Sequence, residues 1–285
     1  DIIDGASTYI GWIFAGIPFV FLYNMVSAIM RALGDSKTPL YFLVLTSAVN
    51  IVLDLVLIIN FNMGVLGAAV ATDVSQAISG VISLIYLIKK FPILRVHGEE
   101  WRWRGHFVAR LCGMGIPMGL QYSITAIGSV ILQTAVNGLG SVVVASMTAG
   151  GKLSMFFCCP FGAFGSTMAT YAGQNLGAGK LDRVTKGMVQ CSFVAAGYSV
   201  VAAVVMILFG KSFALLFVDS TEVEIIANVA KLLIINSLFF IPLALVNIIR
   251  FAIQGLGFGK LAIFAGVAEM VGRSIVGFGF VARFG

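Results

Sequence analysis

Residues 39–60 read PLYFLVLTSAVNIVLDLVLIIN, an apolar run in which Asp54 is the one charged residue. A helix that crosses a bilayer needs about 20 mainly apolar residues, whereas a strand of a membrane barrel needs only about 9–11 with strict alternation. Because the run is long and does not alternate, it predicts a membrane-spanning α-helix.

The rest of the chain has the same character. Hydrophobic residues make up 59% of the 285 residues and charged residues 11%, while a soluble domain carries about 25% charged residues. The sequence therefore predicts an all-α integral membrane protein, built as a polytopic helical bundle. Eight spanning segments are expected, at residues 6–30, 39–60, 64–88, 107–137, 141–170, 187–217, 224–249 and 261–283.

Basic residues gather in every second loop between these segments. The even-numbered loops hold Lys211 alone among basic residues, beside Asp219, Glu222 and Glu224, and the odd-numbered loops hold the other loop Lys and Arg. Since basic residues in short loops favour the cytoplasmic side, we expect a multi-pass plasma-membrane protein with its odd-numbered loops in the cytoplasm. The chain then begins outside, which implies an odd number of spans before residue 1.

The longest polar segment, residues 89–106, reads KKFPILRVHGEEWRWRGH. Trp101 and Trp103 between arginines could stack on nucleic-acid bases, but Trp at the headgroup level beside a basic loop is the interpretation that a membrane protein favours. No nucleic-acid partner is expected. We expect residues 96–106 to be a cytoplasmic linker between a three-helix part, residues 1–95, and a five-helix part, residues 107–285.

An internal repeat relates the two parts. Asn24, Leu33, Gly34 and Lys37 match Asn247, Leu256, Gly257 and Lys260 at one constant offset. Six segments separate the copies, and both copies end on the same predicted side. Two bundles of six helices related by duplication have this spacing, and transporters often use such a plan.

Sites for catalysis or metal binding are not expected. The four cysteines stand in apolar surroundings, where a thiol behaves as a small hydrophobe, and no Ser or Cys has a plausible His and carboxylate partner. The two histidines, His97 and His106, share one loop. We therefore expect neither an enzyme nor a metalloprotein.

Two longer stretches carry a family resemblance. Residues 29–72, IMRALGDSKTPLYFLVLTSAVNIVLDLVLIINFNMGVLGAAVAT, and residues 168–184, MATYAGQNLGAGKLDRV, resemble the multidrug and toxic compound extrusion (MATE) family of prokaryotic type. The likeness covers essentially the whole chain, which would correspond to helices four to eleven of twelve. Residues 1–95 would then form the second half of an N-terminal lobe, and residues 107–285 a truncated C-terminal lobe.

The resemblance implies a two-lobe transporter of six plus six helices. Such a protein exports drugs or organic cations by antiport with protons or sodium. It acts as a monomer in the lipid bilayer and needs no cofactor besides the coupling ion.

Asp54 is the first candidate for binding that ion. A carboxylate at bilayer depth is costly and should face a cavity or a partner, and Asn50 lies one helical turn earlier on the same face. The pair could share one cation or one proton, or Asp54 could bond to a neighbouring helix as a structural contact. By resemblance, Asn50, Asp54 and Thr72 match three residues of the N-lobe cation site, whose remaining Asp would lie on the first helix of the family.

The C-terminal part lacks comparable carboxylates. Where the sodium-coupled branch of the family carries a Glu, this chain has Gln121, and its seventh segment offers Asn247 in place of an Asp. We expect Gln121, Tyr122 and Asn247 to line the substrate path and no C-lobe carboxylate cation site. Glu269 and Arg273, one turn apart, are expected to pair and fix the packing, with an ion-relay role as the alternative; the sequence leaves the roles of Asp73, Lys152 and Lys231 open.

Two other functions compete with drug export. A lipid-linked oligosaccharide flippase of the same superfamily would need a strongly cationic cavity for pyrophosphate, and few arginines of this chain lie at midplane depth. An integral membrane enzyme would need clustered His, Cys or carboxylate residues, which the sequence does not offer. Both considerations favour the exporter.

Overall fold

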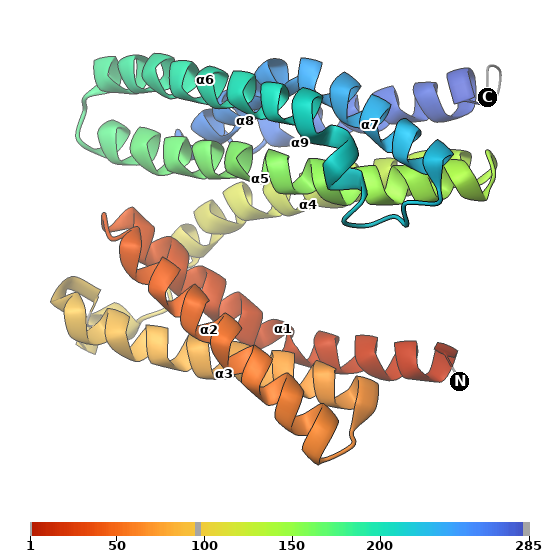
Figure 1. The fold of residues 1–285 in the computed structure, drawn as a ribbon. Helices are drawn as coiled ribbons and strands as arrows, with labels where there is room; N and C mark the ends of the chain where they lie inside the picture. Colours follow the sequence, from red (N-terminus) through yellow and green to blue (C-terminus); the bar gives the residue numbers. More distant parts are fainter. Residues whose placement is uncertain (1, 95–97, 282–285) are drawn as a thin grey trace. The chain divides into compact units, whose positions relative to one another are not determined.

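The computed structural model describes residues 2–94 and 98–281, and in these ranges every regular element is helical (Figure 1). The expected all-α fold is confirmed. Residues 95–97 of the basic segment and residues 282–283 of the last expected span lie outside the described residues. The α-helices are α1 (Ile2–Ala32), α2 (Lys37–Leu55), α3 (Gly64–Lys90), α4 (Gly105–Asn137), α5 (Ser141–Gly177), α6 (Leu181–Ala214), α7 (Val223–Leu238), α8 (Phe240–Gly255) and α9 (Leu261–Ser274).

Seven described helices are long and apolar enough to cross a membrane, and an eighth span results if α7 and α8 are taken together. The segment expected at 224–249 is thus broken, with a bend of 52° between α7 and α8. Pro242 accounts for the break, because a proline ring clashes with the carbonyl four residues earlier. That residue is Leu238, where α7 ends.

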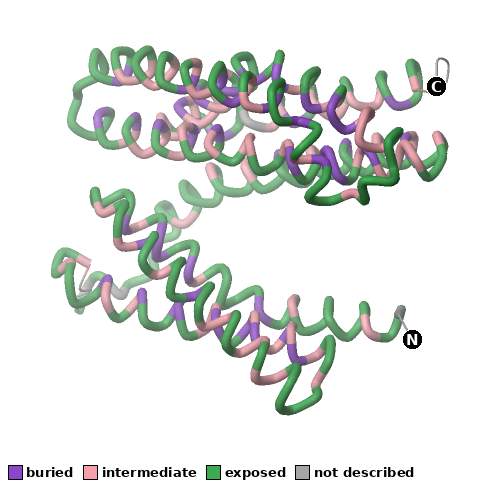
Figure 2. Tube along the Cα trace, viewed as in Figure 1, coloured by how far each residue is buried: buried purple, intermediate pink, exposed green. Residues whose placement is uncertain are grey.

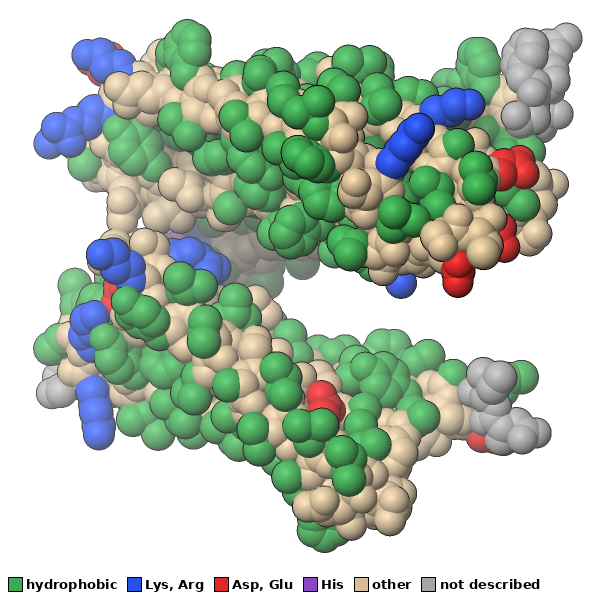
Figure 3. Space-filling view, in the orientation of Figure 1, with side chains coloured by type: hydrophobic (Ala, Val, Ile, Leu, Met, Phe, Trp, Pro, Cys, Tyr) green, Lys and Arg blue, Asp and Glu red, His purple; other side chains and the backbone are tan. Residues whose placement is uncertain are grey.

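The surface of the helices is the reverse of that of a soluble protein. Hydrophobic side chains are spread over the visible face of each part (Figure 3), and many of the exposed ones are large, while many buried positions hold small or polar residues. In the segment Lys37–Asn60, only 6% of the apolar 18-residue stretch is buried within the protein. Soluble monomers rarely expose such continuous apolar surface, so this surface fits contact with lipid.

The chain divides into two compact units, residues 1–103 and 104–285. Their identity as the two lobes expected from the sequence stays a prediction. In unit 1, α1 runs parallel to α3, and small residues bring them close: a Cβ atom on Gly80 would lie 3.4 Å from the carbonyl oxygen of Phe19. The helix α2 packs antiparallel on α3, where Thr46 donates a hydrogen bond to Oγ of Ser79.

Unit 2 has its core among α5, α6, α7 and α8. The ring of Phe161 contacts the rings of Tyr198 at 5.6 Å and Phe240 at 5.5 Å, both edge-on. Figure 2 shows that the buried residues follow the faces where these helices meet. Beside this core, α4 and α9 pack closely in parallel, with Gly128 against the Cα atom of Met270.

The two copies of the repeat have the same local structure. After α1, the amide of Asp35 donates to the carbonyl of Met30 and that of Gly34 to the carbonyl of Arg31. After α8, the matching amides of Phe258 and Gly257 donate to the carbonyls of Ile253 and Gln254. Both helices thus end in a Schellman motif, and its glycine has positive φ in each copy, 89° at Gly34 and 95° at Gly257.

Candidate cation site

The helix α2 carries Asn50 and Asp54 one turn apart on one face. Directly after Leu55 the backbone changes to a π-helix, Val56–Asn60. Such wide turns are frequent at functional sites. Asp54 is therefore the last polar side chain before a local change in helix geometry.

Both side chains have buried polar atoms without a partner. Among the described residues, neither Oδ1 of Asp54 nor Nδ2 of Asn50 has a hydrogen-bond partner, and both atoms are shielded from solvent. A buried polar atom left unpaired costs about 1–3 kcal/mol, and more when it is charged. A turn of the Asn50 amide by 180° exchanges its nitrogen and its oxygen, so this pair can offer a ligand two oxygens.

The packing of α2 on α3 determines which residues of the two helices lie at the same depth along the helix axes. Thr46 bonds to Ser79 at one level, and Leu57 lies against Gly67 at another. Asn50 and Asp54 lie between these contacts on α2, and Thr72 lies between them on α3. Thr72 is thus at the depth of the pair, but its hydroxyl donates to the carbonyl of Ala68 at 2.9 Å. No hydrogen bond joins Thr72 to Asn50 or Asp54 in the described part of the chain.

The sequence analysis missed Gln76. It follows Thr72 by one helical turn on α3, and its Oε1 atom is also buried without a partner among the described residues. The i,i+4 spacing of two polar residues in a spanning helix was the available signal. Gln76 adds a third unsatisfied group to the region of α2–α3 packing.

Asp73 points to a different interface. It is 8% exposed and lies against α1, where a Cβ atom on Gly16 would overlap its carboxylate. The sequence left open whether Asp73 joins the site of Asp54. Its contact with Gly16 places it on the α1 side of α3, away from the packing of α2 on α3.

In unit 2, the three residues expected to line the substrate path differ in exposure. Gln121 is 1% exposed, and its Oε1 accepts a hydrogen bond of 3.0 Å from Nε2 of Gln254, so it joins α4 to α8 in this structure. Tyr122 is 54% exposed. Asn247 is half-buried; it donates to the carbonyl of Leu243 and accepts from Arg250 at 2.8 Å.

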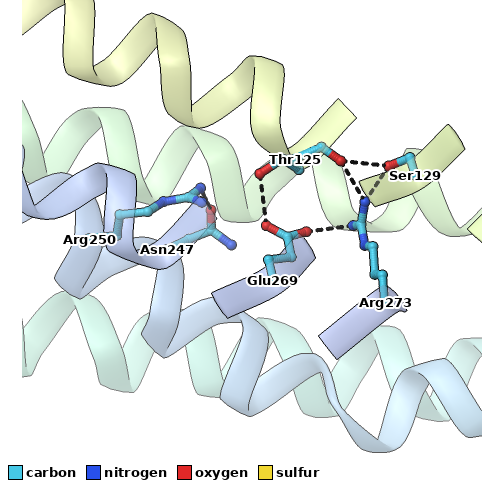
Figure 4. Close-up of polar contacts among 6 residues, drawn as sticks. All are labelled: Thr125, Ser129, Asn247, Arg250, Glu269 and Arg273. Carbon is cyan, nitrogen blue, oxygen red and sulfur yellow. Dashed lines mark hydrogen bonds and ion pairs between the residues drawn. The ribbon is translucent and has the colours of Figure 1, made fainter. Parts of the chain in front are cut away.

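A polar network connects α4 and α9 (Figure 4). The expected pair of Glu269 and Arg273 is confirmed as an ion pair. Thr125 donates to Oε2 of Glu269 at 3.1 Å, and Arg273 donates to the carbonyl of Thr125 at 3.0 Å and to the hydroxyl of Ser129. The carboxylate and the guanidinium are thus both held by the neighbouring helix.

Comparison with known proteins assigns this fold. A family model described as MatE matches residues 1–56 and 117–278, a range that includes Asn50 and Asp54 but not Thr72. The chain is 34% identical over 221 residues to the probable multidrug resistance protein YpnP of Bacillus subtilis, covering 76% of this chain and 48% of that protein. It is 25% identical over 150 residues to the multidrug export protein MepA of Staphylococcus aureus, covering 53% of this chain and 33% of MepA.

Solved structures agree in fold. One described as the outward-facing conformation of a multidrug resistance MATE family transporter of the MOP superfamily has a TM-score of 0.90 at 20% identity, covering 97% of this chain and 62% of that one. A MATE structure in the straight conformation has a TM-score of 0.84 at 18% identity, covering 96% and 68%. The chain spans about half the length of the first curated relatives it matches.

Proposed function

Because this chain belongs to the MatE family of multi-pass membrane proteins, we propose that it works within an exporter of drugs or organic cations driven by inward flow of protons or sodium. In this proposal Asp54 and Asn50 bind the coupling cation, with Thr72 as a neutral ligand. The protein is a transporter and not an enzyme. The substrate class follows the names of the relatives, a probable multidrug resistance protein and a multidrug export protein.

The observation that carries the proposal is the pair of unpartnered buried atoms, Oδ1 of Asp54 and Nδ2 of Asn50. A carboxylate in a spanning helix is retained at a cost, and this one makes no compensating hydrogen bond through Oδ1 in the described residues. A proton or a sodium ion bound there would remove the cost. Oxygen ligands from a carboxylate and an amide suit such hard cations.

The cycle requires a group whose charge can change. A bound cation can drive transport only if its affinity differs between the outward-open and inward-open states. Asp54 is ionised when it binds sodium and neutral when it binds a proton, and in either form the bound site carries less net charge at bilayer depth. Unloading at the cytoplasmic side restores the charged carboxylate, which makes return to the loaded state depend on the ion gradient.

Flippase function finds less support. Pyrophosphate recognition needs cationic side chains that are free to bind phosphate oxygens. Arg273 is paired with Glu269, and Arg250 bonds to Asn247 and lies over the ring of Phe251 at 5.3 Å. Arg273 and Arg250 thus each bond to another side chain of unit 2, although Nε of Arg250 is buried without a partner among the described residues. Neither guanidinium is wholly free to bind phosphate, which favours an exporter of cations.

Equilibrium binding tests the site directly. The complete protein is purified in detergent. One assay measures the binding of radioactive sodium, and a separate assay measures the release of protons when a drug cation is added. We expect Asp54→Asn to lose whichever of the two signals the parent protein gives. Asn50→Ala and Thr72→Val should weaken it, since each removes one neutral ligand. Unchanged signals in folded Asp54→Asn would refute the assignment.

A further inference from the structure

The repeat relates not only the two helix ends but also the helices that follow them. Asn24 and Asn247 each donate to the carbonyl four residues earlier, at 2.8 and 2.9 Å. The Schellman motifs come next, and then α2 begins at Lys37 and α9 at Leu261, directly after Lys260. The two helices therefore start within one residue of equivalent points of the repeat.

The equivalence holds along the α-helical part of both helices. The offset that relates Lys37 to Lys260 pairs Thr46 with Glu269 and Asn50 with Arg273. Both helices then change to a π-helix, at Val56–Asn60 after α2 and at Ile275–Val281 after α9, and the change after α9 comes four residues earlier than the offset would place it.

The candidate cation site therefore has a counterpart in unit 2, and that counterpart contains a fixed positive charge. The guanidinium of Arg273 stands at the position equivalent to Asn50 and has the carboxylate of Glu269 one turn earlier. The side chains of Arg273 and Glu269 are 30% and 34% exposed, so both are partly buried within the protein. The α-helical part of α9 ends at Ser274, so it carries no carboxylate one turn after Arg273 as α2 carries Asp54 one turn after Asn50.

The polar groups around the pair support a permanent cation. The hydroxyls of Thr125 and Ser129 and the carbonyl of Thr125 come from α4, and the last two accept hydrogen bonds from Arg273 (Figure 4). The helix α8 carries Arg250, bonded to Asn247. Among the described residues, no hydrogen bond joins that second pair to Glu269 or Arg273. The network thus holds one carboxylate and one guanidinium bonded to each other.

We propose that Arg273 is a resident cation at the unit 2 position equivalent to Asn50, and that Glu269 binds a proton when Arg273 is removed. An ionised carboxylate that loses its partner in an apolar environment becomes neutral by taking up a proton. Unit 1 leaves its carboxylate open to a mobile cation, while unit 2 supplies the cation from its own chain. That unit 1 binds a mobile cation rests on the proposed function, but the charge state of Glu269 does not depend on it.

The infrared absorption of protonated carboxyl groups reports the charge state of Glu269, and this measurement needs no transport assay. The complete protein is measured at pH 7 as the parent form, as Arg273→Gln, as the charge-retaining Arg273→Lys, as Glu269→Gln and as the double variant with both glutamines. We expect Arg273→Gln to gain the absorption of one protonated carboxyl group. The double variant should not show it, and Arg273→Lys should match the parent form.

Two results would overturn the proposal. One is a folded Arg273→Gln protein without the new absorption. The other is a protonated-carboxyl signal of the parent protein that disappears in Glu269→Gln, which would mean that Glu269 is already neutral beside Arg273. The second comparison needs no charge-deleting change at Arg273, so it decides the matter even where Arg273→Gln does not fold. Failure of cation binding at Asp54 would leave both results unaffected.

Discussion

Lys90, the last residue of α3, donates a hydrogen bond of 2.7 Å to Oδ2 of Asp35 in the turn between α1 and α2. Thr38 donates to both oxygens of the same carboxylate, at 3.1 Å from its amide and 2.7 Å from its hydroxyl. The Lys90 ammonium also lies 5.1 Å from the centre of the Tyr86 ring. These contacts fasten the α1–α2 turn to the end of α3.

Because of this contact, the stability of the protein should decrease at acidic pH. The hydrogen bond from Lys90, with those from Thr38, lowers the pKa of Asp35 from 3.8 to about 2. A carboxyl group whose pKa is lower in the folded state stabilises the fold above its unfolded pKa and loses this effect as the pH falls. The contribution of Asp35 is therefore complete above about pH 4 and disappears toward pH 2.

We expect Asp35→Asn to lower the midpoint of thermal unfolding by roughly 1–3 °C at pH 6, since exposed ion pairs contribute little. The difference from the parent protein should shrink as the pH falls from 4 to 2. Thermal unfolding of the detergent-purified protein at several pH values measures it. A difference that stays constant down to pH 2 would show that the Asp35 carboxylate does not have this lowered pKa.

Backbone contact between α5 and α8 predicts a strong effect at one glycine. A Cβ atom on Gly255 would lie 2.7 Å from the Cα atom of Ala169, and a backbone cannot move aside as a side chain can. Gly255→Ala should destabilise unit 2 by about 1–3 kcal/mol. Gly151→Ala on α5 is the matched control, because nothing lies within 4 Å of a Cβ atom there. Equal unfolding midpoints for the two variants would contradict the close contact of α5 and α8.

The Gln121–Gln254 pair allows a test by double substitution. Gln121→Leu leaves Nε2 of Gln254 without its acceptor in a buried place and should cost about 1–3 kcal/mol. Replacing both residues by Leu removes both polar groups and should restore most of the stability. Chemical unfolding of the two single variants and the double variant measures the coupling. If the double variant loses the sum of the single losses, the hydrogen bond between these residues contributes nothing.

Unit 2 should not carry the ion coupling. Asn247→Ala removes the acceptor of Arg250 but no carboxylate, so we expect gradient-driven export to continue with a changed preference among drug cations. Export of several fluorescent cations under one imposed gradient tests this. Loss of export of every cation in a normally folded Asn247→Ala protein would place coupling in unit 2.

The sequence predicted what depends on local pattern. Run length predicted the spanning helices, and the i,i+4 spacing predicted the Glu269–Arg273 pair. The break between α7 and α8 was not predicted, although Pro242 was visible, because an apolar run with a proline can form either a kinked helix or two helices. Pro117 and Pro160 lie inside continuous helices and show the other outcome.

Contacts between distant segments could not be predicted from the pattern. Gln254 stands 133 positions from Gln121, and nothing near either residue indicates the other. The orientation of Asp73 toward Gly16 depends on which face of α3 meets α1, since neighbouring helix positions differ by about 100°. The partnerless Oε1 of Gln76 is likewise a property of packing. The candidate site was thus predicted in its α2 part and only incompletely in its α3 part.

The measurement that tests the central claim most directly is gradient-driven export of a fluorescent cation from vesicles containing the complete protein. A proton gradient and a sodium gradient are imposed in turn. We predict that Asp54→Asn abolishes export under the effective gradient while membrane insertion and expression stay near normal. Asp73→Asn, which neutralises the other buried carboxylate of α2–α3, should retain it. Export at the parent level by Asp54→Asn would contradict the account and reduce Asp54 to a residue of helix packing.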